Sequence, residues 1–162
     1  MGKSKKVILL GNFGVGKTSL VRQYVFHKFS DDYMTTIGVR IDKKVVSANN
    51  SEVSLIIWDI AGESTHQKIP DSYKLGAHGI IYVIDVLRPS TYQSIEDEIL
   101  SLQNLLPNAP IIKVANKIDL LTEKERAEIV NDLPLADYVL CSAKNGENVE
   151  MAFHKLAEEL TR

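Results

Sequence analysis

Short apolar runs alternate along the chain with segments in which apolar residues recur every three or four positions. The apolar runs cover residues 7–10, 53–58, 80–86, 111–115 and 138–141. Helical spacing covers residues 17–28, 90–106, 122–131 and 146–161. Strands that alternate with helices in this way predict a mostly parallel sheet with helices on both faces.

A different pattern marks one edge of this sheet. Ile37, Val39 and Ile41 alternate with polar residues, as in a half-exposed strand. Residues 49–51 (Asn-Asn-Ser) then separate two apolar runs, which predicts a hairpin and antiparallel pairing at that edge. The predicted fold class is therefore α/β, with a doubly wound, six-stranded, mostly parallel sheet and one antiparallel edge strand, in a single domain over residues 1–162.

Composition narrows the classes of function. The 162 residues are 44% apolar and 25% charged, which suffices for a full hydrophobic core, and the formal net charge is −2. This near balance argues against binding of nucleic acid through bulk positive potential. The chain has one cysteine, Cys141, so an intramolecular disulfide is excluded. Its longest apolar runs are far shorter than the ~18 residues that cross a bilayer, and we expect a cytoplasmic protein.

Residues 11–18 (Gly-Asn-Phe-Gly-Val-Gly-Lys-Thr) match the pattern GxxxxGK[ST] between a predicted strand and a predicted helix. The backbone N–H groups of such a loop can surround an anion, and the helix N-terminus adds its dipole. Lys17 can reach the terminal phosphates and the Thr18 hydroxyl can bind Mg²⁺. The alternative is a glycine-rich turn without a ligand, which is disfavoured because every fixed position is filled in the expected context.

Three further strings follow predicted strands. Asp59 lies where a carboxylate can reach the Mg²⁺ sphere, and Gly62 can offer its N–H to a γ-phosphate. Residues 116–119 (Asn-Lys-Ile-Asp) end in a carboxylate that matches the paired donors of guanine, which adenine lacks. Residues 142–144 (Ser-Ala-Lys) follow the last strand and supply a loop near the same base edge. Four such strings in this order predict a guanine-nucleotide site.

These motifs together resemble those of Ras-like small GTPases, nearest the Rab branch in residues 36–39 (Thr-Ile-Gly-Val) and 58–59 (Trp-Asp). The resemblance covers essentially the whole chain and implies a P-loop NTPase G domain that binds Mg²⁺ with GTP or GDP and hydrolyses GTP. It also implies two switch segments, residues 30–38 and 59–73, which bind effector and regulator proteins.

The resemblance also implies a role for individual residues. The nucleotide would be bound by Gly11, Phe13, Gly14, Val15, Gly16, Lys17, Thr18, Ser19, Phe29, Tyr33, Thr36, Gly62, Asn116, Lys117, Asp119, Ser142, Ala143 and Lys144. The Mg²⁺ ion would be bound by Thr18, Thr36 and, through water, Asp59. Hydrolysis would involve Lys17, Thr36 and Gly62.

Two positions depart from the family pattern. Glu63 occupies the place of the glutamine that orients the attacking water, and its carboxylate cannot donate a hydrogen bond and opposes the negative γ-phosphate. Phe13 occupies a loop position that is glycine or another small residue in the family, so a benzyl group would crowd the space around the γ-phosphate. We therefore expect slow hydrolysis. In an alternative, Gln67 or Arg40 replaces the missing glutamine.

The sequence also bears on two other classes of function. Phe13 and Glu63 are also compatible with a constitutively GTP-bound binding module that has lost its catalytic activity. An ATP-using P-loop enzyme is disfavoured by Asp119 and by the lack of an arginine-rich lid. The chain ends at Arg162 without a cysteine to prenylate, so we expect no lipid anchor and, where the protein reaches a membrane or complex, recruitment by a protein partner.

Overall fold

The computed structural model describes residues 2–32, 36–62, 68–132 and 137–162. Within these residues six strands form one sheet in the order β2-β3-β1-β4-β5-β6. Their bounds are β1 Lys3–Leu10, β2 Val39–Ala48, β3 Ser51–Ile60, β4 Gly79–Asp85, β5 Ile111–Asn116 and β6 Tyr138–Leu140. The edge strand β2 runs antiparallel to β3, and the other neighbours are parallel, so the predicted fold class is confirmed.

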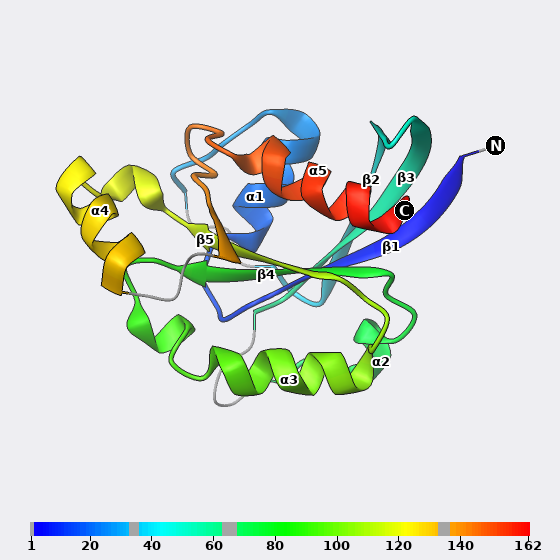
Figure 1. The fold of residues 1–162 in the computed structure, drawn as a ribbon, viewed down its shortest axis with the longest axis horizontal. Coiled ribbons are helices and arrows are strands. Elements are labelled where there is room, and N and C mark those ends of the chain that lie inside the picture. Colours follow the sequence, from blue (N-terminus) through cyan, green and yellow to red (C-terminus); the bar gives the residue numbers. More distant parts are fainter. Residues whose placement is uncertain (1, 33–35, 63–67, 133–136) are drawn as a thin grey trace.

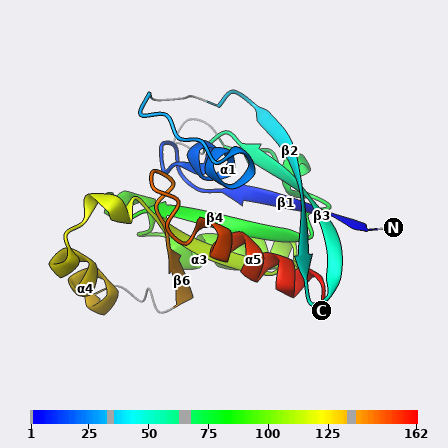
Figure 2. The ribbon, with the colours of Figure 1, turned by 90° about the horizontal axis from the view of Figure 1, so that it is seen from above.

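Helices cover both faces of the sheet. The α-helices are α1 Lys17–Phe26, α2 Asp71–Lys74, α3 Ile95–Leu105, α4 Glu123–Asp132 and α5 Val149–Leu160, and the 3₁₀ turns are η1 Pro89–Thr91 and η2 Ile118–Leu120. Helices α1 and α5 lie on one face, and α2 and α3 lie on the other (Figure 1). Seen from above, α1 and α5 lie side by side across the strands, and α4 stands at one end of the molecule (Figure 2). None of the helices in the described segments is long and apolar enough to cross a bilayer.

Two apolar layers hold the helices against the sheet. On the α1 and α5 face, Tyr24 stacks on Phe153 with ring centroids 3.9 Å apart and planes 4° apart, and Leu156 packs against the strands beside them. On the α3 face, Leu102 packs against the opposite side chains of the same strands. Strand β4 lies in the middle of the sheet and is buried along its whole length, which explains its unbroken apolar sequence.

The hairpin between β2 and β3 has the predicted turn. Asn49 and Asn50 have φ values of 50° and 58°, and a two-residue turn with both residues in the left-handed region matches the twist of the flanking strands. Ser51, predicted as part of the turn, is already the first residue of β3. The strand predicted from Ile37 begins at Val39, and Ile37 itself is 91% exposed.

Several boundaries differ from the predicted ones for local reasons. The first helix ends at Phe26 because His27 adopts φ 54°, and the last begins at Val149 because Asn148 adopts φ 59°. The helix predicted over residues 90–106 is divided into η1 and α3. Strand β1 extends back to Lys3, which pairs with Val53 of β3.

Candidate functional site

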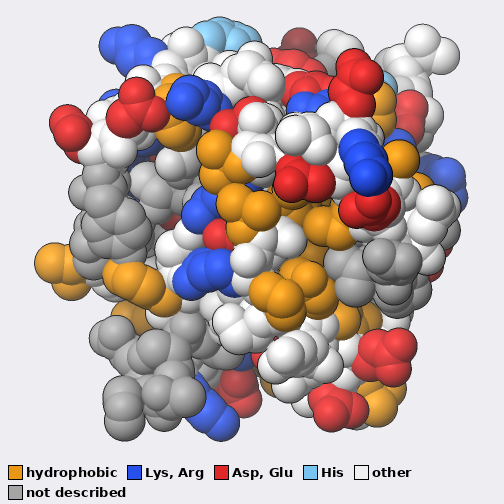
Figure 3. Space-filling view, turned by 90° about the vertical axis from the view of Figure 1, so that its left-hand side faces the viewer, with side chains coloured by type: hydrophobic (Ala, Val, Ile, Leu, Met, Phe, Trp, Pro, Cys, Tyr) orange, Lys and Arg blue, Asp and Glu red, His pale blue; other side chains and the backbone are white. Residues whose placement is uncertain are grey.

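The candidate site lies at the end of the sheet where the parallel strands finish. The loop of residues 11–16 follows β1, Asp59 is near the end of β3, and Asp85 and Asn116 close β4 and β5. Figure 3 shows the molecule from this end, with hydrophobic and basic side chains gathered in the middle of the face. A pocket of about 320 Å³ opens there. This is the edge at which doubly wound sheets bind ligands.

The glycine-rich loop wraps around a buried cation. The Lys17 side chain is almost fully buried, and its Nζ donates hydrogen bonds to the carbonyl oxygens of Gly11 (3.0 Å) and Asn12 (3.3 Å). Gly16 adopts φ 100°, and a Cβ there would stand 2.3 Å from Nδ2 of Asn116. Position 16 therefore requires glycine, both for its left-handed backbone conformation and for its close approach to Asn116.

Three oxygen-bearing side chains meet beside this lysine. The Thr18 hydroxyl donates to Oδ2 of Asp59 at 2.6 Å, and the Thr36 hydroxyl contacts both the Thr18 hydroxyl and the same carboxylate oxygen. Asp59 is 1% exposed, and its Oδ1 has no hydrogen-bond partner within the described part of the chain. Burial raises the pKa of Asp59, against the hydrogen bond from Thr18 and the charge of Lys17. A buried carboxylate oxygen without a partner beside two hydroxyls fits a hard divalent cation such as Mg²⁺.

A second group of polar side chains joins the glycine-rich loop to the ends of β5 and β6. Asn116 Nδ2 donates to the Val15 carbonyl (2.9 Å), and its Oδ1 accepts from the Ala143 N–H (3.1 Å). The Ser142 hydroxyl donates to Oδ1 of Asp119 at 2.8 Å. Asn116 and Asp119 also line the pocket. These bonds hold a carboxylate at the pocket wall, where it can accept hydrogen bonds from a ligand with paired donors.

The rim of the pocket is formed by residues 29–32 and by the loop after β6. Phe29 lines the pocket with its ring partly exposed, and Asp31 forms an ion pair with Lys144 across 3.8 Å. Ser30, Asp31, Asp32 and Leu120 line the pocket although no motif singled them out individually. The resemblance placed Ser30, Asp31 and Asp32 only within the switch segment 30–38 and gave these side chains no role of their own.

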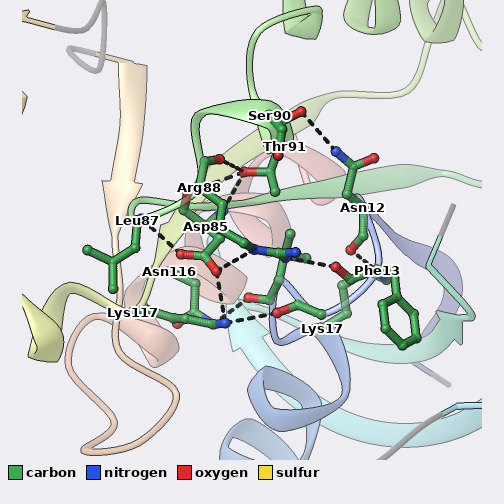
Figure 4. A network of polar contacts seen from close by, with 12 residues as sticks. Asn12, Phe13, Lys17, Asp85, Leu87, Arg88, Ser90, Thr91, Asn116 and Lys117 are labelled. Atoms are coloured by element: carbon green, nitrogen blue, oxygen red, sulfur yellow. Dashed lines mark hydrogen bonds and ion pairs between the residues drawn. The ribbon is translucent and has the colours of Figure 1, made fainter. Parts of the chain in front are cut away.

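Behind the loop, one buried carboxylate organises two cations (Figure 4). Oδ2 of Asp85 accepts from Arg88 Nε and from Lys117 Nζ, each at 2.9 Å, and Oδ1 accepts from the Leu87 N–H at 2.9 Å. Burial opposes ionisation, but the hydrogen bonds from Lys117, Leu87 and Arg88 hold the pKa of Asp85 below its ordinary value. Asp85 and Arg88 belong to none of the motifs found in the sequence. The available signal was an aspartate at the end of a continuous apolar strand.

Phe13 and Gly62 are in direct contact at the boundary of the pocket. A Cβ at Gly62 would stand 2.6 Å from Cα of Phe13, so the two backbones touch. The Phe13 side chain is 47% exposed, and the residue lines both the pocket and the neighbouring cleft toward α3. Arg40 forms an ion pair with Asp42 (3.3 Å), a residue outside the pocket lining.

Most predicted site residues meet at this pocket. Its lining includes Phe13, Gly14, Gly16, Lys17, Thr18, Ser19, Phe29, Thr36, Asp59, Gly62, Asn116, Lys117, Asp119, Ala143 and Lys144. Gly11, Val15 and Ser142 are buried behind this lining. Tyr33, Glu63 and Gln67 lie outside the described residues.

Comparisons with known proteins agree with this geometry. A model of the Ras family matches residues 6–162. The Ras-related protein Rab-1 of Theileria annulata is 35% identical over 161 residues, which cover 96% of this chain and 73% of that protein. The Ras-related protein Rab-7b of Mus musculus is 34% identical over 164 residues (94% and 80%), and the Ras-related protein Rab7 of Drosophila melanogaster is 36% identical over 165 residues (94% and 78%).

Proposed function

Because this chain belongs to the Ras family of small GTP-binding switch proteins, we propose that residues 1–162 form one G domain that binds Mg²⁺ with GTP or GDP and hydrolyses GTP slowly. One observation carries the proposal. The oxygen cluster of Thr18, Thr36 and Asp59 and the carboxylate of Asp119 line the same pocket. The first group suits a Mg²⁺ ion with phosphates, and the second suits the paired N–H donors of guanine.

At the phosphate end, the chain supplies charge and oriented donors. Lys17 neutralises the terminal phosphates, and the loop N–H groups surround them. Thr18, Thr36 and Asp59 hold Mg²⁺, Asp59 through water, and the ion supplies electrostatic stabilisation of the phosphate oxygens when bound. Gly62 offers its N–H to the γ-phosphate. The presence or loss of the γ-phosphate is therefore transmitted to residues 59–73.

At the base end, Asp119 accepts two hydrogen bonds from guanine, and Asn116 keeps the loop and the strand ends together. In this proposal Phe29 and Lys144, which line the pocket, flank the base, and Lys117, Ser142 and Ala143 complete its surroundings. Tyr33 extends over the phosphates in this proposal. Adenine lacks donors that match Asp119, so the site discriminates against ATP.

Hydrolysis is proposed to be slow for two reasons. Glu63 cannot donate a hydrogen bond to the attacking water, and its charge opposes the transition state. The Phe13 backbone touches Gly62, and we propose that the benzyl group of Phe13 crowds the space that an activator's arginine would need. An arginine finger can contribute ~10³ to 10⁵ in rate, so its exclusion would prolong the GTP-bound state. Gln67 is the other candidate for positioning water, and Arg40 is less suited because it is paired with Asp42.

Output is proposed to occur through partner proteins. Effectors and regulators would bind residues 30–38 and 59–73, which change with the γ-phosphate. We propose that the protein acts in the cytoplasm, with recruitment to a membrane or complex by such a partner.

Nucleotide competition tests the binding proposal. Fluorescent GDP bound to the protein should be displaced by GTP and not by equimolar ATP. Equal displacement by ATP would contradict the guanine site. The nucleotide extracted from purified protein then separates a switch from its alternative, because a constitutively loaded binding module would carry GTP almost exclusively.

Single-turnover hydrolysis of bound GTP tests the slow rate. The Glu63→Gln variant should hydrolyse GTP faster than the native chain, and the Gln67→Ala variant should match the native rate. If the native chain already turns over at the rate of ordinary small GTPases, Glu63 is no impairment. If Gln67→Ala then abolishes that activity, Gln67 is the group that positions the water.

A further inference from the structure

Arg88 connects a buried carboxylate to the backbone of the glycine-rich loop, 75 residues away in sequence. Its Nε donates to Oδ2 of Asp85 at 2.9 Å, and its Nη2 donates to the Phe13 carbonyl oxygen at 2.7 Å. Figure 4 shows the side chain reaching from the turn after β4 toward the loop. The Thr91 hydroxyl donates to the Arg88 carbonyl at 2.8 Å and keeps this turn closed. The position of the Arg88 guanidinium is therefore set by Asp85 and Thr91, which lie in the same segment, independently of its contact with the loop.

The contact completes a series along the loop. Three successive carbonyl oxygens accept hydrogen bonds from outside the loop: Phe13 from Arg88 Nη2 (2.7 Å), Gly14 from Lys117 Nζ (2.9 Å) and Val15 from Asn116 Nδ2 (2.9 Å). In a planar trans peptide the N–H points away from the carbonyl of the same unit. Each of these bonds therefore turns the next residue's N–H to the opposite side of the loop.

The side to which the first N–H turns is the nucleotide pocket. Arg88 lines the neighbouring cleft between the loop and α3, whereas Gly14 lines the pocket. With the Phe13 carbonyl held by Arg88, the Gly14 N–H is directed away from that cleft. Gly14 precedes helix α1 by three residues, and Phe13 touches Gly62, so this N–H belongs to the distal phosphate end of the site.

We infer that Arg88 is a positioning residue for phosphate binding, which orients the Phe13–Gly14 peptide so that the Gly14 N–H faces the β- and γ-phosphates of the nucleotide. This rests on the proposed function, since it concerns the same pocket. Arginine suits the role because its planar fork binds a carboxylate and a carbonyl at once, which a lysine ammonium cannot do in one fixed geometry. Asp85, itself buried, fixes where the fork lies.

The test compares nucleotides that differ in phosphate number. Dissociation of fluorescent GDP in the presence of Mg²⁺ is measured for the native chain, for Arg88→Gln and Arg88→Lys, and for Leu87→Ala as a control in the same turn. Leu87 contacts Asp85 through its backbone N–H, so truncating its exposed side chain keeps the network. GMP affinity is measured for the same proteins by competition.

Loss of one charge-assisted hydrogen bond from a part-exposed arginine should speed GDP dissociation roughly tenfold in Arg88→Gln. Arg88→Lys should be impaired as well, since the fork is lost while the charge remains. GMP affinity should stay within about twofold of native, because GMP lacks the distal phosphates, and Leu87→Ala should match the native chain throughout.

Unchanged GDP dissociation in both Arg88 variants would overturn the inference. An increase in the GDP dissociation rate matched by an equal fold-loss of GMP affinity would also overturn it, because Arg88 would then support the fold rather than the phosphate site. Should Arg88→Gln fail to fold, Arg88→Lys retains a cation beside Asp85 and supplies the same comparison. Failure of the native chain to bind GDP would instead contradict the proposed function itself.

Discussion

Replacing Gly62 by alanine should impair the response to the γ-phosphate while sparing GDP binding. The added Cβ would stand 2.6 Å from Cα and 2.7 Å from N of Phe13, and 3.0 Å from the carbonyl carbon of Asn12. All three are backbone atoms, so no side-chain rotation relieves the clash. One of the two backbone segments has to move.

The size of the movement follows from these distances. Carbon atoms in favourable contact lie about 3.5–4.0 Å apart, so the two backbones have to separate by roughly 1 Å. The Phe13 carbonyl is held by Arg88, and we therefore expect the segment at Gly62 to move. A displacement of about 1 Å at a reacting group can cost ~10²-fold in rate. We expect a loss of that order in GTP hydrolysis and a change below about threefold in GDP affinity, since GDP lacks the γ-phosphate.

Single-turnover hydrolysis and dissociation of GDP and of a thio-GTP analogue measure these effects. Gly79→Ala is the matched control, because its Cβ would meet Cδ1 of Leu156 at 2.8 Å, and Leu156 is a core side chain that does not line the pocket. That variant should lose about 1–3 kcal/mol of stability and keep the native preference between GTP and GDP. A Gly62→Ala protein that hydrolyses GTP at the native rate would contradict this prediction, since the clash would then have no consequence at the γ-phosphate.

Three further outcomes are expected. Asp119→Asn should lower GDP affinity by about 10²-fold or more, because charge-assisted hydrogen bonds to the base are lost. Xanthosine diphosphate should compete with GDP better in this variant than in the native chain. Unchanged GDP affinity in a competition assay would contradict the role of Asp119. Burial and then the charge of Glu147 raise the pKa of Cys141 from 9.0 to about 12, so its thiol should resist a disulfide reagent at pH 8 until urea is added. The unfolded thiol ionises first, so stability should fall as pH rises from about 9 toward 12, and a Cys141→Ala variant should lose this dependence. Phe153→Ala should cost about 3–5 kcal/mol in urea unfolding, with Phe153→Leu less affected, because the ring stacked on Tyr24 leaves a cavity; a cost below about 1 kcal/mol would contradict this packing.

Features that depend on residues close together along the chain could be predicted from the sequence. The continuous apolar run of residues 80–86 predicted a strand of the parallel sheet, because such a run is stable only where both faces of the sheet are covered, and β4 is buried along its whole length. Asn49 and Asn50 tolerate the left-handed conformation, which predicted the hairpin and with it the antiparallel edge. The glycines of the phosphate loop and the residues after each strand predicted the pocket, because parallel strands all end at the same edge of the sheet.

Helix ends were less predictable. Whether His27 or Asn148 adopts a left-handed φ depends on the contacts of the chain that follows, and both residues are also acceptable inside a helix. Residues 27–28 and 146–148 contain no apolar side chain that would mark the boundary, and the predicted helices were two or three residues too long at these ends.

Which side chains from different strand ends meet at the site depends on the order of the strands in the folded sheet. Placing β1 between β3 and β4 brings Thr18 to Asp59 and Arg88 to the Phe13 carbonyl, although these partners lie 41 and 75 residues apart. Hydrogen bonds of this kind depend on direction and on distances of a few tenths of an ångström, and no spacing along the chain encodes either. The sequence predicted a loop for phosphates, and the fold decided what holds that loop in place.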